Sequence, residues 1–198
     1  MKLAKFFWSL GSLLINVVVV TYVMLMRQVP GDRQAVYRYM NEHWETFGGH
    51  WKAEFLLMAM IAVGAFYFAV HFRKFSWILI TVGQMVLLFL YPIMLGGYRG
   101  TPLELAEMAN QIATTVFLFG NMLFFLGVFY LYREDRLLPK WLRATAMVLS
   151  ALFTAATTVA YTGILSWQEL IVVAPVANII YLINAYYGLK LQPEKALS

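Results

Sequence analysis

Four side-chain amides lie close to the middle of four separate apolar stretches of the chain: Asn16, Gln84, Asn121 and Asn178. An amide surrounded by hydrocarbon needs a hydrogen-bonding partner, so each side chain is expected to point toward another part of the protein. Two roles fit this pattern: hydrogen bonds that hold helices together, or a polar pocket at the membrane midplane, where transporters commonly bind their substrates. Because no carboxylate or lysine is predicted at that depth, such a pocket would take a neutral or amphiphilic molecule.

A second group of side chains has the chemistry to bind a divalent metal. His50 and Glu54 are four residues apart, which places them on one face of a predicted helix. Glu104 and Glu107 are three residues apart and also share a face. A histidine with several carboxylates can hold a divalent cation, so this acidic rim is a candidate metal site. The alternative is helix capping, because acidic side chains stabilise the N-terminus of a helix without any metal.

The residue counts exclude several other chemistries. The chain has no cysteine, which rules out disulfides, thiolate metal sites and iron–sulfur clusters. His43 and His50 are predicted on one side of the membrane and His71 on the other, so a haem held by two histidines is not expected. Neither a glycine-rich phosphate loop nor a serine–histidine–aspartate set is present. The sequence therefore predicts no cofactor and favours a function other than catalysis.

The elements that must position these side chains are membrane-spanning helices. Hydrophobic residues make up 62% of the chain and charged residues 13%, against about 45–50% and about 25% in soluble proteins. Because a span needs roughly 20 apolar residues, the sequence predicts an all-α, six-helix integral membrane bundle that forms a single domain over residues 1–198. The first span is longer than a signal peptide and lacks a cleavage site, so it is expected to be retained. The predicted spans are residues 6–26, 53–72, 76–96, 108–132, 142–162 and 168–188.

The distribution of basic residues predicts the orientation of the spans, because loops rich in Lys and Arg remain in the cytoplasm. Ten basic residues fall on the predicted inner side: Lys2, Lys5, Arg73, Lys74, Arg133, Arg136, Lys140, Arg143, Lys190 and Lys195. Five fall on the outer side: Arg27, Arg33, Arg38, Lys52 and Arg99. Both termini are therefore expected in the cytoplasm. The net charge of +5 is scattered over short loops, so nucleic acid is not an expected partner.

One long connection, residues 27–52, lies on the predicted outer side. Asp32 follows a Pro-Gly turn and is expected to cap a short amphipathic helix that continues through Tyr39. Such a helix would lie on the membrane or over the mouth of the bundle. Aromatic side chains at both predicted interfaces are expected to anchor the protein at headgroup level. They are Trp8, Trp77 and Trp141 on the inner side, and Trp44, Trp51, Tyr98 and Trp167 on the outer side.

The stretch from Phe119 to Gly163 carries a resemblance to a known family. Phe-Gly-Asn at 119–121 and Tyr-Leu-Tyr-Arg at 130–133 precede Leu-Leu-Pro-Lys-Trp-Leu at 137–142. This pattern resembles a bacterial family of small polytopic membrane proteins classified only as a domain of unknown function, in which a similar Pro-basic-Trp-Leu turn joins two spans. The resemblance implies a multi-pass protein of the inner (cytoplasmic) membrane of bacteria. It implies no catalytic residue.

Three functions fit these observations. The first is binding or transport of a small neutral or amphiphilic molecule in a midplane pocket, with the long outer loop as a lid. The second is an accessory or assembly subunit of a larger membrane complex. The chain would then bind another membrane protein or a second copy of itself, in addition to the lipid bilayer. The third is a membrane enzyme with a metal at the outer acidic rim.

Overall fold

The computed structural model describes residues 1–29, 31–164 and 174–192, and within these ranges the chain is almost entirely helical. The apolar segments of the sequence form long helices because, in hydrocarbon, a helix satisfies all of its backbone hydrogen bonds internally. The helices are α1 (Lys2–Met26), α2 (Arg33–Glu42), α3 (Trp44–Phe72), α4 (Phe75–Leu88), α5 (Leu90–Gly97), α6 (Leu103–Glu134), α7 (Lys140–Tyr161) and α9 (Ala174–Lys190).

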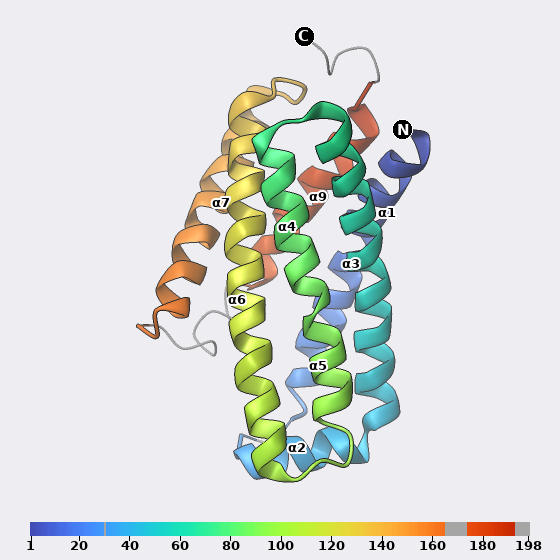
Figure 1. Ribbon diagram of the computed structural model, residues 1–198, viewed down its shortest axis with the longest axis vertical. Helices are drawn as coiled ribbons and strands as arrows, with labels where there is room; N and C mark the ends of the chain where they lie inside the picture. The colour runs from blue at the N-terminus through green and yellow to red at the C-terminus, as the bar shows by residue number, and fades with distance from the viewer. Residues whose placement is uncertain (30, 165–173, 193–198) are drawn as a thin grey trace.

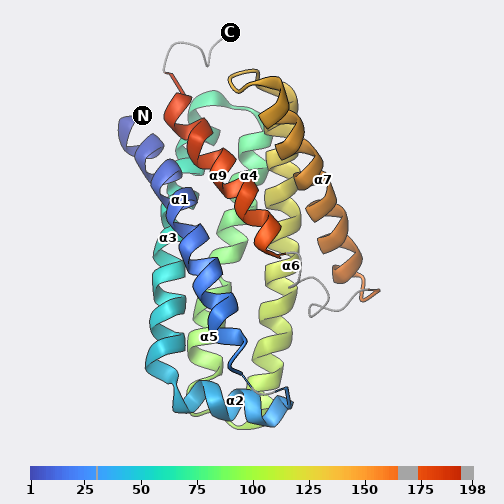
Figure 2. The same cartoon turned by 180° about the vertical axis from the view of Figure 1, so that it is seen from behind.

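The long helices run side by side along one axis, and α2 lies across one end of them (Figure 1). Each long helix packs on the next in the ring α1, α3, α4, α6, α7, α9, and α9 returns to α1. The packing between α7 and α9 is the least extensive in this ring. The start of α1 and the end of α9 lie together at the end opposite α2, as both views show (Figure 2). We call this end the basic end, since it carries Lys2, Lys74, Lys140 and Lys190, and the opposite end the α2 end.

Five helical segments of the described chain are long and apolar enough to cross a membrane. They correspond to the first five predicted spans, with α4 and α5 together forming the third. The chain is therefore a membrane-embedded helical protein. Of the sixth predicted span, residues 168–188, the first part lies outside the described residues, and the remainder belongs to α9.

Two helices are longer than the spans predicted for them. α3 has 29 residues and α6 has 32, which at a rise of 1.5 Å per residue gives lengths of about 43 and 48 Å. The hydrocarbon core of a bilayer is only about 30 Å thick. Both helices therefore extend past the apolar segment toward the α2 end, where α3 begins at Trp44 rather than near residue 53.

The third span is interrupted at Phe89, which separates α4 from α5. Pro92 explains the interruption, because proline has no N–H to donate and its ring clashes with the carbonyl four residues earlier, here that of Leu88. At the break the helix makes a hydrogen bond that spans three residues instead of four: the Phe89 N–H donates to the Val86 carbonyl at 3.1 Å. The sequence prediction treated this span as one continuous helix and did not anticipate the break.

The predicted helix in the long connection is present as α2. The Asp32 side chain accepts a hydrogen bond from the Ala35 N–H at 3.0 Å, which confirms the predicted cap. The helix continues to Glu42, three residues beyond Tyr39. Asn41 Oδ1 accepts a hydrogen bond from the Gly100 N–H at 2.7 Å, so α2 is tied to the loop between α5 and α6. Of the two locations predicted for this helix, it takes the one over the bundle (Figure 1).

Removal of the cap is expected to loosen α2 without disturbing the bundle. Asp32→Ala deletes the acceptor for the Ala35 N–H, and the loss of an N-cap typically costs about 1 kcal/mol of helix stability. Amide hydrogen exchange over residues 33–42 should therefore accelerate several-fold. Gln34→Ala, which changes an exposed side chain of the same helix, is the control and should leave exchange nearly unchanged. Equal exchange in the two variants would contradict a capping role for Asp32.

The predicted aromatic belt is wrong for three of its tryptophans and for Tyr98, which is 4% exposed. Trp8, Trp77 and Trp51 are 0%, 0% and 1% exposed and belong to the core. The Trp8 indole N–H donates to the Asn184 carbonyl at 2.8 Å, so its one polar atom is satisfied inside the protein. Trp141, by contrast, is 68% exposed, as the prediction requires. Trp167 lies outside the described residues.

Candidate functional site

Two of the four predicted amides donate hydrogen bonds to carbonyls of their own helices. Asn16 Nδ2 donates to the Ser12 carbonyl at 2.7 Å and to the Leu13 carbonyl at 3.0 Å. Asn121 Nδ2 donates to the Phe117 carbonyl at 2.9 Å, one turn earlier in α6. Neither amide nitrogen needs a partner from another helix. In the described part of the chain, no hydrogen bond joins any two of the four amides, and the midplane pocket they were predicted to line remains a prediction.

Three of the four amides carry a buried atom that lacks a partner among the described residues, and the first is Asn16 Oδ1. Gln84 on α4 is 0% exposed, and neither atom of its amide has a partner in ordinary hydrogen-bond geometry among the described residues. The Tyr181 hydroxyl of α9 is near enough to interact with this amide, but only at longer range. Asn178, also on α9, has a buried Oδ1 that lacks a partner within the same set of residues. Buried amide atoms without partners are costly, so a bound molecule that reached Gln84 or Asn178 would lower that cost.

The residues predicted to bind a metal are divided between two helices. His50 and Glu54 lie on α3, and Glu104 and Glu107 lie at the start of α6. No group of three or more His, Asp or Glu side chains with metal-binding geometry occurs in the described part of the chain. The His50 ring instead stacks on Tyr22 of α1, with the ring centres 5.5 Å apart.

The Glu54 side chain is only partly buried, and it lies well along α3 and not at the start of this helix. Because α3 begins at Trp44, ten residues and nearly three helical turns precede this carboxylate. The Tyr91 hydroxyl of α5 lies close enough to interact with this carboxylate. The hydroxyls of Tyr22 on α1 and Tyr181 on α9 are near enough to interact with its charge. We call Glu54, Tyr22, Tyr91, Tyr181 and Gln84 the Glu54 cluster, which joins five helical segments.

The composition of the Glu54 cluster determines what it can bind. Tyr91 and Tyr181 are 1% and 6% exposed, so their hydroxyls have only protein groups or a bound molecule as partners. A carboxylate accepts hydrogen bonds, whereas a phenol or an amide can both donate and accept. The cluster can therefore bind a hydroxyl, amide or amine group of a small molecule. A partly buried carboxylate near the edge of an apolar span is a reason to suspect function, because burying its charge is costly.

A groove lies between α1 and α9, the helices that carry Tyr22 and Tyr181 of the Glu54 cluster. It has a volume of about 180 Å³ and combines four aliphatic side chains with one cation and one amide. Tyr22 is three residues from the lining residue Val19, and Tyr181 is three residues from Asn178, so both tyrosines occupy adjacent faces of the helices that form the groove. The lining residues are Val19, Val20, Val23, Met24, Arg27 and Asn178.

Aromatic side chains close the bundle between the Glu54 cluster and α2. Tyr98 is 4% exposed and packs on Trp51 with ring centres 5.5 Å apart. Burial raises the pKa of Tyr98 well above its ordinary value, so the hydroxyl stays protonated and donates to Asn110 Oδ1 at 2.7 Å. The Arg99 guanidinium lies 5.8 Å from the centre of the Trp44 ring. Access to the cluster from the α2 end therefore requires these side chains to move.

A polar network near the basic end was not predicted from the sequence. Asn184 of α9 accepts a hydrogen bond from the Tyr132 hydroxyl at 2.7 Å through its side chain. Asp135, which follows α6, accepts one from the Tyr187 hydroxyl at 2.8 Å and lies 4.0 Å from Lys74 Nζ. Asn184 resembles the predicted amides in type, but it lies too near the end of its span to have been counted among them. These hydrogen bonds join α9 to α6, so we interpret the network as structural. The Nδ2 atom of Asn184 is buried and has no partner among the described residues.

Comparisons with protein-family models, with curated proteins and with solved structures find no match to the chain. The resemblance of the turn at Pro139 to a bacterial family therefore stays a prediction. The function must be inferred from the geometry of the Glu54 cluster and its groove.

Proposed function

We propose that the chain is a six-span protein of the bacterial inner membrane, with both termini in the cytoplasm, that binds or transports a small neutral or amphiphilic molecule. The observation that carries this proposal is the groove between α1 and α9, the helices that also carry two tyrosines of the Glu54 cluster. The orientation is supported by the position of α1 and α9, whose first and last residues lie together at the basic end. Loops rich in Lys and Arg stay on the cytoplasmic side of a membrane.

The chemistry of the groove matches an amphiphile. Val19, Val20 and Val23 offer an aliphatic wall for the apolar part of a ligand. The unpartnered Oδ1 of Asn178 needs a donor, which a hydroxyl or amide of the ligand would supply. The volume of about 180 Å³ is below the 300–1,000 Å³ typical of small-molecule pockets. The ligand is therefore a small molecule, or one that binds by only part of its length.

The proposal is tested by native mass spectrometry of the protein extracted gently from its own membrane. A small molecule that remains bound should be released and identified, and its affinity measured for two variants. Asn178→Leu and Glu54→Gln should each weaken binding about tenfold or more, because each leaves polar atoms of the bound ligand or the cluster without their partners. Thermal unfolding in detergent, measured on the same samples, separates loss of the ligand site from loss of the fold.

Glu104→Gln is the matched control, since it removes a carboxylate that is exposed at the start of α6. It should bind the ligand like the wild-type chain. The proposal is wrong if no small molecule remains bound, or if Glu54→Gln and Asn178→Leu fold normally and retain the wild-type affinity.

An accessory subunit is the second candidate, and the outer face of α7 favours it. The residues Ala144, Ala151, Ala155 and Thr158 are all exposed, and their spacing of seven, four and three residues puts them on one face of the helix. Small residues let helix backbones approach closely within a membrane. In the same mass spectra, a protein partner bound in fixed ratio and lost when Ala151 is changed to Leu would favour this candidate.

A further inference from the structure

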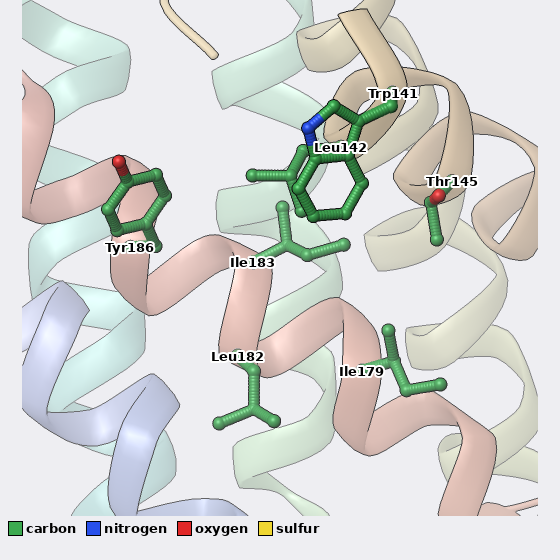
Figure 3. Close-up of a pocket in the computed structure, with 7 residues that line it drawn as sticks. All are labelled: Trp141, Leu142, Thr145, Ile179, Leu182, Ile183 and Tyr186. Atoms are coloured by element: carbon green, nitrogen blue, oxygen red, sulfur yellow. The ribbon is translucent and has the colours of Figure 1, made fainter. Parts of the chain in front are cut away.

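A second groove lies between α7 and α9, on the side of the molecule where the ring of helices is least tightly packed. Its volume is about 280 Å³. Figure 3 shows Trp141 and Thr145 of α7 together with Ile179, Leu182 and Ile183 of α9. Leu142 and Tyr186 complete the lining. We call this the α7–α9 groove.

The surface of the α7–α9 groove is suited to a hydrocarbon chain. Five of its seven lining side chains are aliphatic or tryptophan. Ile179 is 44% exposed and Leu182 is 48% exposed, so the groove opens sideways, toward the lipid in a membrane-embedded chain. From Ile179 to Tyr186 α9 rises about 10 Å, which accommodates part of an acyl chain.

The charges at one end of the groove favour an anionic headgroup. Lys190 Nζ lies 5.3 Å from the ring centre of Tyr186, which lines the groove. Lys140 directly precedes Trp141, and both are exposed. Neither α7 nor α9 contains an Asp or Glu. The nearest acidic group in the loop before α7, Asp135, is engaged by Tyr187, Lys74 and the Leu137 N–H.

We propose that the α7–α9 groove binds one anionic phospholipid, with an acyl chain along Ile179, Leu182 and Ile183 and the phosphate near Lys140 and Lys190. Basic pockets between spans attract anionic headgroups through charge, and the hydrocarbon of the lipid matches the aliphatic lining. A neutral phospholipid would fill the groove equally well but would leave both ammonium groups without a counter-ion. The proposal does not depend on the function assigned to the Glu54 cluster.

The experiment is native mass spectrometry of the purified chain in detergent, titrated with phosphatidylglycerol and with phosphatidylcholine of identical acyl chains. Each lysine near an anionic lipid surface contributes about fivefold to affinity, so with two lysines the first tight site should prefer phosphatidylglycerol by about 25-fold. The double variant Lys140→Gln/Lys190→Gln should abolish this preference. Ile179→Trp, which extends a bulky ring over the groove, should remove the tight site while both lysines remain.

Lys2→Gln/Lys5→Gln is the matched control, since it makes the same change in charge at the same end but on α1. It should retain the preference for phosphatidylglycerol. The proposal is overturned if the wild-type chain shows no preference, or if the two double variants lose it equally, which would indicate only the general charge of the basic end. It is also overturned if Ile179→Trp melts like the wild-type chain and still binds phosphatidylglycerol tightly.

Discussion

Gly83→Ala is expected to lower the free energy of unfolding by about 2–3 kcal/mol, because a methyl group at this position has no space. A Cβ placed on Gly83 would lie 2.6 Å from the Phe124 backbone nitrogen and 2.8 Å from the Gly120 carbonyl oxygen. Both are backbone atoms, which cannot rotate aside as the end of a side chain can. The extra methyl must therefore push α4 away from α6, which is the most extensively packed pair of helices in the bundle.

The effect of Gly83→Ala is measured by thermal unfolding of the purified protein in detergent, followed by circular dichroism. Gly96→Ala is the matched control. A Cβ at Gly96 meets nothing within 4 Å, and alanine is favoured over glycine in a helix by up to about 1 kcal/mol. Gly96→Ala should therefore leave the melting temperature unchanged or raise it slightly. If both variants melt like the wild type, the close approach of α4 and α6 is wrong.

Trp8→Ala is expected to cost about 3–5 kcal/mol, the range typical of deleting a large buried aromatic side chain. Trp8 is 0% exposed and packs edge-on against Trp77, with ring centres 5.0 Å apart, and against Phe68. Its indole N–H also donates to the Asn184 carbonyl at 2.8 Å. The substitution leaves a cavity where α1, α3, α4 and α9 meet. It also removes the hydrogen bond that joins α1 to α9.

Two further variants separate the contributions of Trp8. Trp8→Phe keeps an aromatic ring but removes the N–H donor, so it should cost less than Trp8→Ala and more than the ~1 kcal/mol of a single hydrogen bond. Phe6→Ala is the control, because Phe6 lies on the same helix but is 54% exposed, and it should change stability by less than about 0.5 kcal/mol. If Trp8→Ala is no more destabilising than Phe6→Ala, then Trp8 lies at the interface, as the belt pattern had predicted.

The two tryptophans Trp8 and Trp141 show where pattern-based prediction fails. Both were predicted as interface anchors, because each lies near a basic end of an apolar span. The sequence gives the depth of a residue in the membrane but not the direction its side chain takes around the helix axis. Direction depends on which neighbour each helix packs against. Trp8 faces α9, which follows it by more than 160 residues, whereas Trp141 faces outward.

Glu54 illustrates the same limit at the candidate site. Lys52 and Glu54 interrupt the apolar run, so the sequence placed this carboxylate at an outer rim with His50. In the structure α3 begins at Trp44, so Glu54 lies well along the helix and not at its start. Its partners Tyr22, Tyr91 and Tyr181 come from three other helices. No spacing within one helix could have revealed this arrangement.

The sequence alone determined the properties that depend on local composition. The length and apolarity of five helices follow from the hydrocarbon thickness and the helical rise, and the cap at Asp32 follows from its own side chain and an N–H three residues later. The break at Phe89 also has a local cause, Pro92, although the sequence prediction did not anticipate it. Only the tertiary structure decided which side chains meet. The Glu54 cluster, the two grooves and the burial of Trp8 all depend on contacts between helices that are distant in the chain, and packing between helices, not hydropathy, determines which faces meet.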